Sequence, residues 1–235
     1  MGDILLVRHG QASFGSEDYD QLSDLGVEQS RLLGRWIVSC GRKIDQVVVG
    51  HMKRHRQTAE ACLAELPQEL RPEAESLAEA GFDEFDSDDV IIRYRPEFAE
   101  RGALVQHLAQ SESPQRAFQK LFSAAVERWV TGHHESEYRE SWKVFRERCV
   151  AGLQRLARDS GRSRTIAVFT SGGPITAICQ HLLELPDRRA FDVNWPMANT
   201  AVTALRYSGD RISLNYLNNF SHLERAGQSQ IITYR

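Results

Sequence analysis

The sequence has no long apolar run and no excess of positive charge. No hydrophobic stretch approaches the roughly 18 residues that a membrane-spanning helix needs. Its 29 Lys and Arg residues are set against 32 Asp and Glu residues, which gives a formal net charge of −3. Such a chain has no overall basic field to attract nucleic acid or an anionic membrane surface. We therefore expect neither of these among its partners, and no apolar face in the sequence indicates an oligomeric state.

Cysteine is scarce, and the four residues form no CxxC pair. Cys40, Cys62, Cys149 and Cys179 are scattered along the chain, and three of them fall on apolar faces of helix-like segments. Free buried thiols are typical of proteins in a reducing compartment. The N-terminus has an acid where a signal peptide has a base, and its apolar run is only four residues long. We expect a cytoplasmic protein.

Glycine and proline are not enriched, with 16 Gly and 7 Pro in 235 residues, of which 41% are hydrophobic. This is the composition of an ordinary globular protein of one large domain, 1–235. Short continuous apolar runs at 4–7, 47–49 and 165–169 predict strands that are buried on both faces. Helical stripes follow each run, and this alternation predicts an α/β fold with a mostly parallel sheet. Segments 200–206 and 211–217 predict a hairpin.

Cap signals and stripes place the predicted helices. Ser23 predicts an N-cap, and the helix after it has an apolar stripe of Leu25, Leu32, Trp36 and Cys40, with Leu33 and Ile37 beside it. Pro174 predicts the first turn of another helix, at position N1. The long helical stretch 90–155 predicts a helical cap subdomain inserted in the domain.

Polar residues follow all three predicted parallel strands. The first strand ends in Arg8-His9-Gly10-Gln11, the second runs into Arg54 and its neighbours, and the third ends in Ser171-Gly172-Gly173. Ligands of such folds bind outside the carboxyl ends of the strands. Arginine forks and a helix start both bind anions, and a neutral imidazole can attack phosphorus. The sequence therefore predicts a phosphate site at this rim.

These motifs resemble those of the histidine phosphatase (phosphoglycerate mutase-like) superfamily. The resemblance implies a three-layer α/β/α sandwich with a helical cap, and hydrolysis of a phosphorylated small molecule or phosphoprotein through a phosphohistidine. It covers the whole core and rests on Leu6–Gln11, Leu22–Gln29, Arg54–Ala59, Leu77–Glu79, Ser171–Ile175 and Asn199–Ala201.

The resemblance assigns a role to each matching residue. His9 is the expected nucleophile, and Glu79 is the expected acid and base. Arg8 and Arg54 are expected to clamp the phosphoryl group. The remaining expected phosphate contacts are Gln11, Ser171 and Gly172. The family implies no metal and no organic cofactor.

One departure from the family concerns position 171, where the second histidine of the family is replaced by serine. A serine hydroxyl cannot carry a positive charge, and we consider that His51 or His55 supplies it instead. An alternative function is a phosphate- or phosphopeptide-binding module without turnover.

A second departure is the acidic stretch 79–86, which replaces the Glu-to-Gly-x-x-Glu-Gly pattern of the family. This difference argues against a third function, that of a phosphoglycerate-type mutase. Asp83 and Glu84 remain alternatives to Glu79 as the acid.

Overall fold

The computed structural model describes residues 1–13, 20–100 and 102–234. It divides into two compact units, each described here by itself. The first unit comprises Met1–Glu84, Arg148–Leu185 and Ala190–Arg235, and the second comprises Phe85–Glu147 and Pro186–Arg189. No helix in the described ranges is long and apolar enough to cross a membrane.

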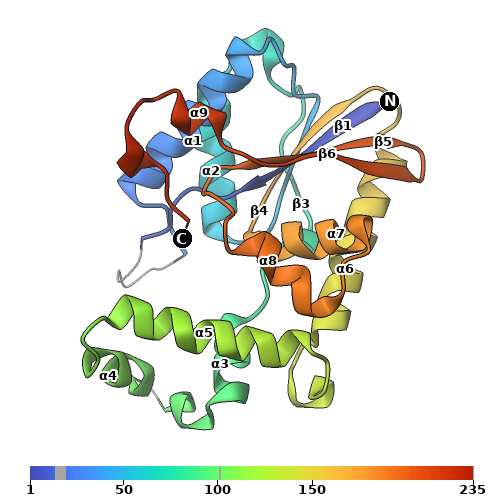
Figure 1. Ribbon diagram of the computed structural model, residues 1–235. Coiled ribbons are helices and arrows are strands. Elements are labelled where there is room, and N and C mark those ends of the chain that lie inside the picture. Colours follow the sequence, from blue (N-terminus) through green and yellow to red (C-terminus); the bar gives the residue numbers. More distant parts are fainter. Residues whose placement is uncertain (14–19, 101, 235) are drawn as a thin grey trace. The chain divides into compact units, whose positions relative to one another are not determined.

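The first unit is built on a sheet whose strand order is β3-β2-β4-β1-β5-β6 (Figure 1). The pairs β1–β4, β2–β4 and β2–β3 are parallel, whereas β1–β5 and β5–β6 are antiparallel. The predicted strands, the hairpin and the mostly parallel sheet are confirmed. The strands are β1 (Gly2–Arg8), β2 (Gln46–Val49), β3 (Leu77–Ala78), β4 (Thr165–Thr170), β5 (Val202–Ser208) and β6 (Arg211–Asn219).

Helices cover both faces of this sheet. In Figure 1, α1, α2 and α9 lie on one side of it and α7 and α8 on the other. The helices of this unit are α1 (Asp24–Ser39), α2 (Lys53–Ala64), the later part of α6 (Trp142–Asp159), α7 (Gly172–Leu183), α8 (Ala190–Asn194), α9 (Ser221–Glu224), and the short 3₁₀ turns η1 (Gln68–Leu70), η2 (Ala80–Phe82) and η6 (Ser229–Ile231).

The core of the first unit follows from the alternation of side chains along the strands. Leu5 and Val7 of β1 point to the same face of the sheet and pack with apolar residues of α1 and α2. Their neighbours Ile4 and Leu6 point to the opposite face and are equally inaccessible to solvent. Burial on both faces explains why the strands have continuous apolar sequences.

The predicted stripe of α1 is wrong by one position. Leu33 and Ile37 are buried, whereas Leu32 and Trp36 are partly exposed and Cys40 is exposed at the helix end. The reason is that α1 approaches other backbones through small residues. A Cβ atom at Gly26 would collide with the Gln11 carbonyl oxygen.

Helix α7 also begins earlier than predicted. Ser171 is its N-cap residue and the helix starts at Gly172, so Pro174 occupies the third helical position rather than the first. The missing N–H of a proline is tolerated throughout the first turn, because those N–H groups have no partner within the helix. The predicted N-cap Ser23 is confirmed, since its hydroxyl accepts a hydrogen bond from Gly26 N.

The second unit is helical around an aromatic cluster. Phe85 lies 4.6 Å from Trp129 between ring centroids, and Trp142 and Phe145 complete the cluster. Such tilted and edge-on ring pairs contribute beyond the apolar area they bury. The elements are α3 (Ser87–Tyr94), η3 (Pro96–Ala99), α4 (Ala103–Ala109), α5 (Pro114–Val130), η4 (Glu135–Glu137), η5 (Asp187–Arg189) and the first turns of α6 (Trp142–Asp159).

The unit boundaries differ from the expected insertion 90–155. The later part of α6 belongs to the first unit, because Gly152 contacts Gly81 backbone to backbone and Arg148 donates a hydrogen bond to the Ala80 carbonyl. Neither glycine has a side chain that would separate the two segments. A function of the second unit as a cap stays a prediction.

The close approach of α1 generates a stability prediction. Replacing Gly26 by alanine improves helix propensity by about 1 kcal/mol, but it forces a Cβ atom onto the Gln11 carbonyl. Overpacking of this kind costs about 1–3 kcal/mol. We expect Gly26→Ala to lower the free energy of unfolding in urea, whereas the exposed Arg31→Ala in the same helix changes it by less than about 0.5 kcal/mol. An equal effect of both variants would contradict the close contact.

Buried His222 generates a prediction about pH. Burial lowers its pKa to about 4, and its Nε2 lies 2.8 Å from the Thr200 hydroxyl. The unfolded chain binds a proton at this ring near pH 6.5 and the folded chain does not, so stability falls as the pH is lowered from about 6.5 toward 4. We expect His222→Gln to remove about 1.4 kcal/mol per pH unit from that slope in urea titrations. Parallel curves for the two proteins would show that His222 takes up no proton on unfolding.

Candidate active site

The register of the parallel strands brings three segments to one rim. Arg8 at the end of β1 is opposite Thr170 at the end of β4, and Val49 at the end of β2 is opposite Phe169. The residues that follow each strand therefore meet. They include His9, Gly50 and Ser171.

His9 is held at this rim in one orientation. Its backbone N–H donates to the Thr170 carbonyl, and its Nδ1 lies 2.7 Å from the Gly10 carbonyl oxygen. Because a carbonyl can only accept, Nδ1 must carry the proton in a neutral ring. The lone pair is then on Nε2, which makes this nitrogen a nucleophile.

Burial and positive neighbours keep the His9 ring neutral. Only 8% of the residue is exposed. Desolvation is the largest cause of a pKa well below the usual value, followed by the charges of Arg54 and Arg8 and the neighbouring His55. A neutral imidazole at physiological pH is the form that can attack an electrophile.

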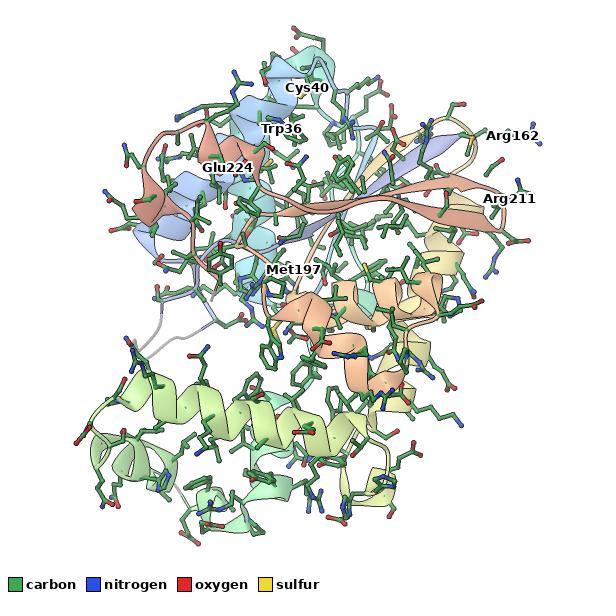
Figure 2. The ribbon with its side chains drawn as sticks, in the orientation of Figure 1. Trp36, Cys40, Arg162, Met197, Arg211 and Glu224 are labelled. Atoms are coloured by element: carbon green, nitrogen blue, oxygen red, sulfur yellow. The ribbon has the colours of Figure 1, made fainter. Side chains whose placement is uncertain are left out.

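Two buried or half-buried arginines stand at the same rim. The Arg8 guanidinium donates to the carbonyl of Met197, a residue labelled in Figure 2 in the segment between α8 and β5. Arg54 is in the first turn of α2 and is tied to the His9 loop through Thr58, which accepts from Gly10 N and donates to the Arg54 carbonyl. Arg8 is therefore held by the segment before β5, and Arg54 by the loop after β1.

Arg54 is only partly satisfied by protein groups. Its Nη1 donates to Asp20 Oδ1 at 2.7 Å, but its buried Nε finds no acceptor within the described ranges. A buried guanidinium N–H without a partner is costly. An anion with several oxygens, such as a phosphoryl group, fits this donor.

Helix α7 presents its N-terminus to the rim. Ser171 is at the N-cap, but its hydroxyl makes no capping bond. Gly173 N instead donates to Glu84 Oε2 at 3.3 Å. A Cβ atom at Gly172 would meet the Asn194 side-chain amide, so a larger residue at this position would require Asn194 to shift.

The Ser171 hydroxyl is bonded to a histidine. His55 Nε2 lies 2.6 Å from Ser171 Oγ, and neither residue is accessible to solvent. Burial and then the Arg54 charge lower the pKa of His55 to about 3. This lowered pKa argues against the hypothesis that His55 supplies a positive charge. The exposed His51 pairs instead with Asp83, at 3.0 Å.

The three candidate acids differ in their partners. Glu79 Oε1 accepts from Gly81 N and from Arg155. Burial alone raises the pKa of Glu79, but these two donors outweigh it and lower the pKa. Asp83 is engaged by His51, and Glu84 by the start of α7.

Gln11 is oriented by the beginning of α1. Its side-chain oxygen accepts a hydrogen bond from the Ser23 hydroxyl at 2.9 Å, and its backbone N–H donates to Gln29. A contact of Gln11 with substrate stays a prediction.

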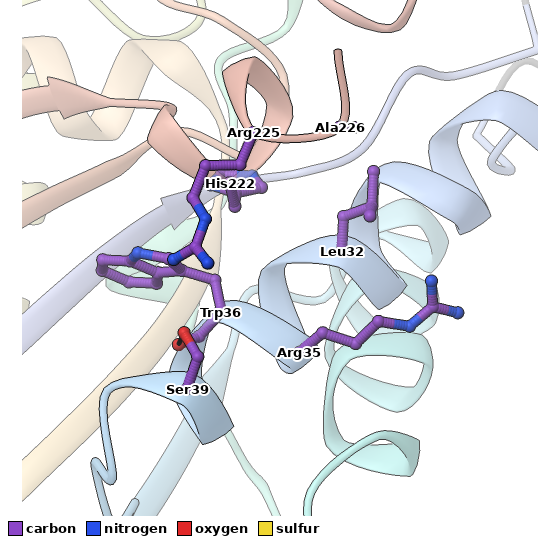
Figure 3. A pocket seen from close by; sticks show the side chains of 7 residues that line it. All are labelled: Leu32, Arg35, Trp36, Ser39, His222, Arg225 and Ala226. Atoms are coloured by element: carbon purple, nitrogen blue, oxygen red, sulfur yellow. Dashed lines mark hydrogen bonds between the residues drawn. The ribbon is translucent and has the colours of Figure 1, made fainter. Parts of the chain in front are cut away.

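A separate pocket of about 170 Å³ lies between α1 and α9 (Figure 3). It shares no residue with the rim, and Arg225 lies beside the Trp36 indole there. Its lining residues are Leu32, Arg35, Trp36, Ser39, His222, Arg225 and Ala226.

In the part of the chain that the structure describes, no three His, Cys, Asp or Glu side chains form a metal-ligand group.

Sequence reasoning missed two features of the rim. The Asp20–Arg54 ion pair joins residues 34 positions apart, and no local pattern indicates it. The pairing of His55 with Ser171 joins residues 116 positions apart. One signal could have indicated the second pairing. His55 stands next to Arg54 in a chain that has serine at position 171, where the family has a histidine.

Comparison with known proteins gives similarities in sequence and in fold. A stretch of 79 residues is 35% identical to the mitochondrial serine/threonine-protein phosphatase Pgam5 of Caenorhabditis briggsae, and it covers 34% of this chain and 28% of that protein. The match thus spans under a third of that relative.

Solved structures of low sequence identity share the fold. A phosphoserine phosphatase variant from Entamoeba histolytica, in complex with phosphoserine, superposes with a TM-score of 0.66 at 15% identity, over 95% of this chain and 100% of that one. A phosphoglycerate mutase from Bacillus anthracis gives 0.63 at 16% identity, over 97% of each chain. The expected phosphoglycerate mutase-like fold is confirmed.

The profile of one protein family matches nearly the whole chain. The matched segments are 4–138 and 89–220, which include all three rim segments. On this evidence the chain belongs to the histidine phosphatase superfamily, branch 1.

Proposed function

We propose that the protein hydrolyses phosphomonoesters through a phosphohistidine on His9. The observation that carries this proposal is the neutral His9 ring, with Nδ1 at 2.7 Å from the Gly10 carbonyl and two arginines close enough to lower its pKa. The proposed substrate is a phosphorylated small molecule or a phosphoprotein.

In the first proposed step, His9 Nε2 attacks phosphorus and the ester P–O bond breaks. The leaving oxygen takes a proton from a carboxylic acid, for which we propose Glu79. Arg8 and Arg54 bind the non-bridging oxygens, where charge is spread in the transition state. The orphaned Nε of Arg54 supports this role.

In the second proposed step, water attacks phosphorus and the P–N bond breaks. The water gives its proton to the carboxylate, and His9 Nε2 regains its lone pair. The bonds from Gly81 and Arg155 favour the ionised form of Glu79, which suits a base. The acid role requires that Glu79 be protonated when the substrate is bound.

The first test is phosphate release from an aryl phosphate by wild type and His9→Ala, with a chelator present. We expect turnover in wild type and none in His9→Ala, because no other group at the rim replaces the attacking nitrogen. We also expect the acidic limb of kcat/KM to lie below pH 6.5, since the pKa of His9 is lowered.

Two other results would change the proposal. Equal rates for both proteins would rule out His9 as nucleophile. Binding of inorganic phosphate without turnover would favour the phosphate-binding module.

The second test identifies the acid. We expect Glu79→Gln to lower kcat on an alkyl phosphate by about 10²–10⁴, the range typical of a lost general acid. The loss on an aryl phosphate is expected to be smaller, because its leaving group needs less protonation. Glu84→Gln is the matched control, as it removes a carboxylate that contacts α7. A leaving-group-dependent loss in Glu84→Gln instead would assign the role to Glu84.

A further inference from the structure

The His55–Ser171 hydrogen bond is a buried polar contact that the proposed function does not use. It connects the first turn of α2 to the N-cap of α7, with 2.6 Å between His55 Nε2 and Ser171 Oγ. Both side chains are fully inaccessible to solvent. A buried polar pair of this kind is costly unless its members satisfy each other.

The same histidine stands beside the nucleophile. The ring centroids of His55 and His9 are 5.9 Å apart, with an interplanar angle of 36°. His55 thus touches groups from two other segments, one after β1 and one after β4. A single side chain connects the attacking imidazole to the helix start.

The surroundings fit a histidine at this position. The ring lies against Gly50, and a Cβ atom there would collide with His55 Nδ1. Residue 50 follows β2, so a third strand end leaves room for the ring.

The proton of His55 can be located from its contacts. The Gly50 backbone is close enough to Nδ1 to favour a protonated ring, but Nδ1 meets no acceptor at hydrogen-bonding geometry in the described ranges. A buried N–H without an acceptor costs more than a bare lone pair. On this geometry we place the proton on Nε2, where Ser171 Oγ accepts it.

We propose that His55 is a positioning residue, which donates its Nε2–H to Ser171 and thereby holds His9 and the start of α7 in fixed relative places. This inference rests on the proposed function. The family has an imidazole at position 171. In this chain His55 supplies an imidazole from α2 instead. It does so as a neutral donor, without a positive charge.

Serine at position 171 follows from this arrangement. Two imidazoles cannot occupy the volume that His55 and Ser171 share, because both sites are fully buried and their polar atoms are already in contact. Ser171 is therefore the hydrogen-bond partner of an imidazole supplied from α2, and not only a position from which a catalytic histidine is missing.

The test moves the imidazole from position 55 to position 171 and measures kcat and KM on an aryl phosphate. We expect His55→Ala and Ser171→His each to lower kcat about 10- to 100-fold with little change in KM, because a small misplacement of reacting groups has effects of this size. The double variant is expected to recover most of kcat, since the imidazole introduced by Ser171→His would enter the space that His55 vacates. Losses that add up in the double variant would overturn the proposal.

Conservative variants separate positioning from folding. His55→Gln places an amide N–H near the Nε2 position, and we expect it to retain kcat within about 5-fold, as a preserved hydrogen bond predicts. His181→Gln, on the exposed side of α7, and Ser160→Ala, which loses a buried hydroxyl bond to Gln46, are the controls. Loss of kcat in His55→Gln equal to that in His55→Ala would show that the amide N–H does not matter and contradict the proposal.

A second measurement does not depend on turnover. The ¹⁵N shifts of the imidazoles report which nitrogen carries the proton, and we expect Nε2–H for His55 and Nδ1–H for His9. An Nδ1–H tautomer of His55 would overturn this inference even if His9 is catalytic. If the wild type hydrolyses nothing, the proposed function fails. The positioning role is then tested by the His9 spectrum alone, and a spectrum that His55→Ala leaves unchanged would overturn it.

Discussion

The parallel pairing of β1 with β4 is the constraint on which the rest of the site depends. It ends with the hydrogen bond from His9 N to the Thr170 carbonyl, immediately before Ser171 begins α7. A shift of one residue would turn the His9 side chain to the other face of the sheet and separate it from α7. Both strands are buried along most of their length, so the rim is supported directly by the apolar core.

Close backbone contacts then bring the helices to the rim. Gly26 of α1 lies against Gln11, and Gly50 after β2 makes room for His55. Thr58 of α2 accepts a hydrogen bond from Gly10 N and so ties this helix to the loop after β1. These contacts need small or hydroxyl-bearing residues, because larger side chains would hold the segments apart.

The same burial sets the electrostatics. His9 and His55 lie beside Arg54, and both low dielectric and positive charge disfavour their protonation. The rim therefore combines permanent positive charge on arginines with neutral imidazoles. Charged arginines beside neutral imidazoles suit an anionic substrate that must be attacked by a neutral nitrogen. A positive charge on His55 would lie beside that of Arg54 and is disfavoured for this reason.

The sequence by itself determined the α/β class, the strands, the strand-end motifs and the family, because these are written in local patterns of burial and in short motifs. It misjudged the buried face of α1, since that face combines Leu33 and Ile37 with glycine and polar residues, whereas Leu32 and Trp36 remain partly exposed. Only the tertiary structure decided that His55 lies on Ser171 and Asp20 on Arg54. Both contacts join residues far apart in the chain, and their existence depends on helix placement over the sheet, which no local pattern encodes.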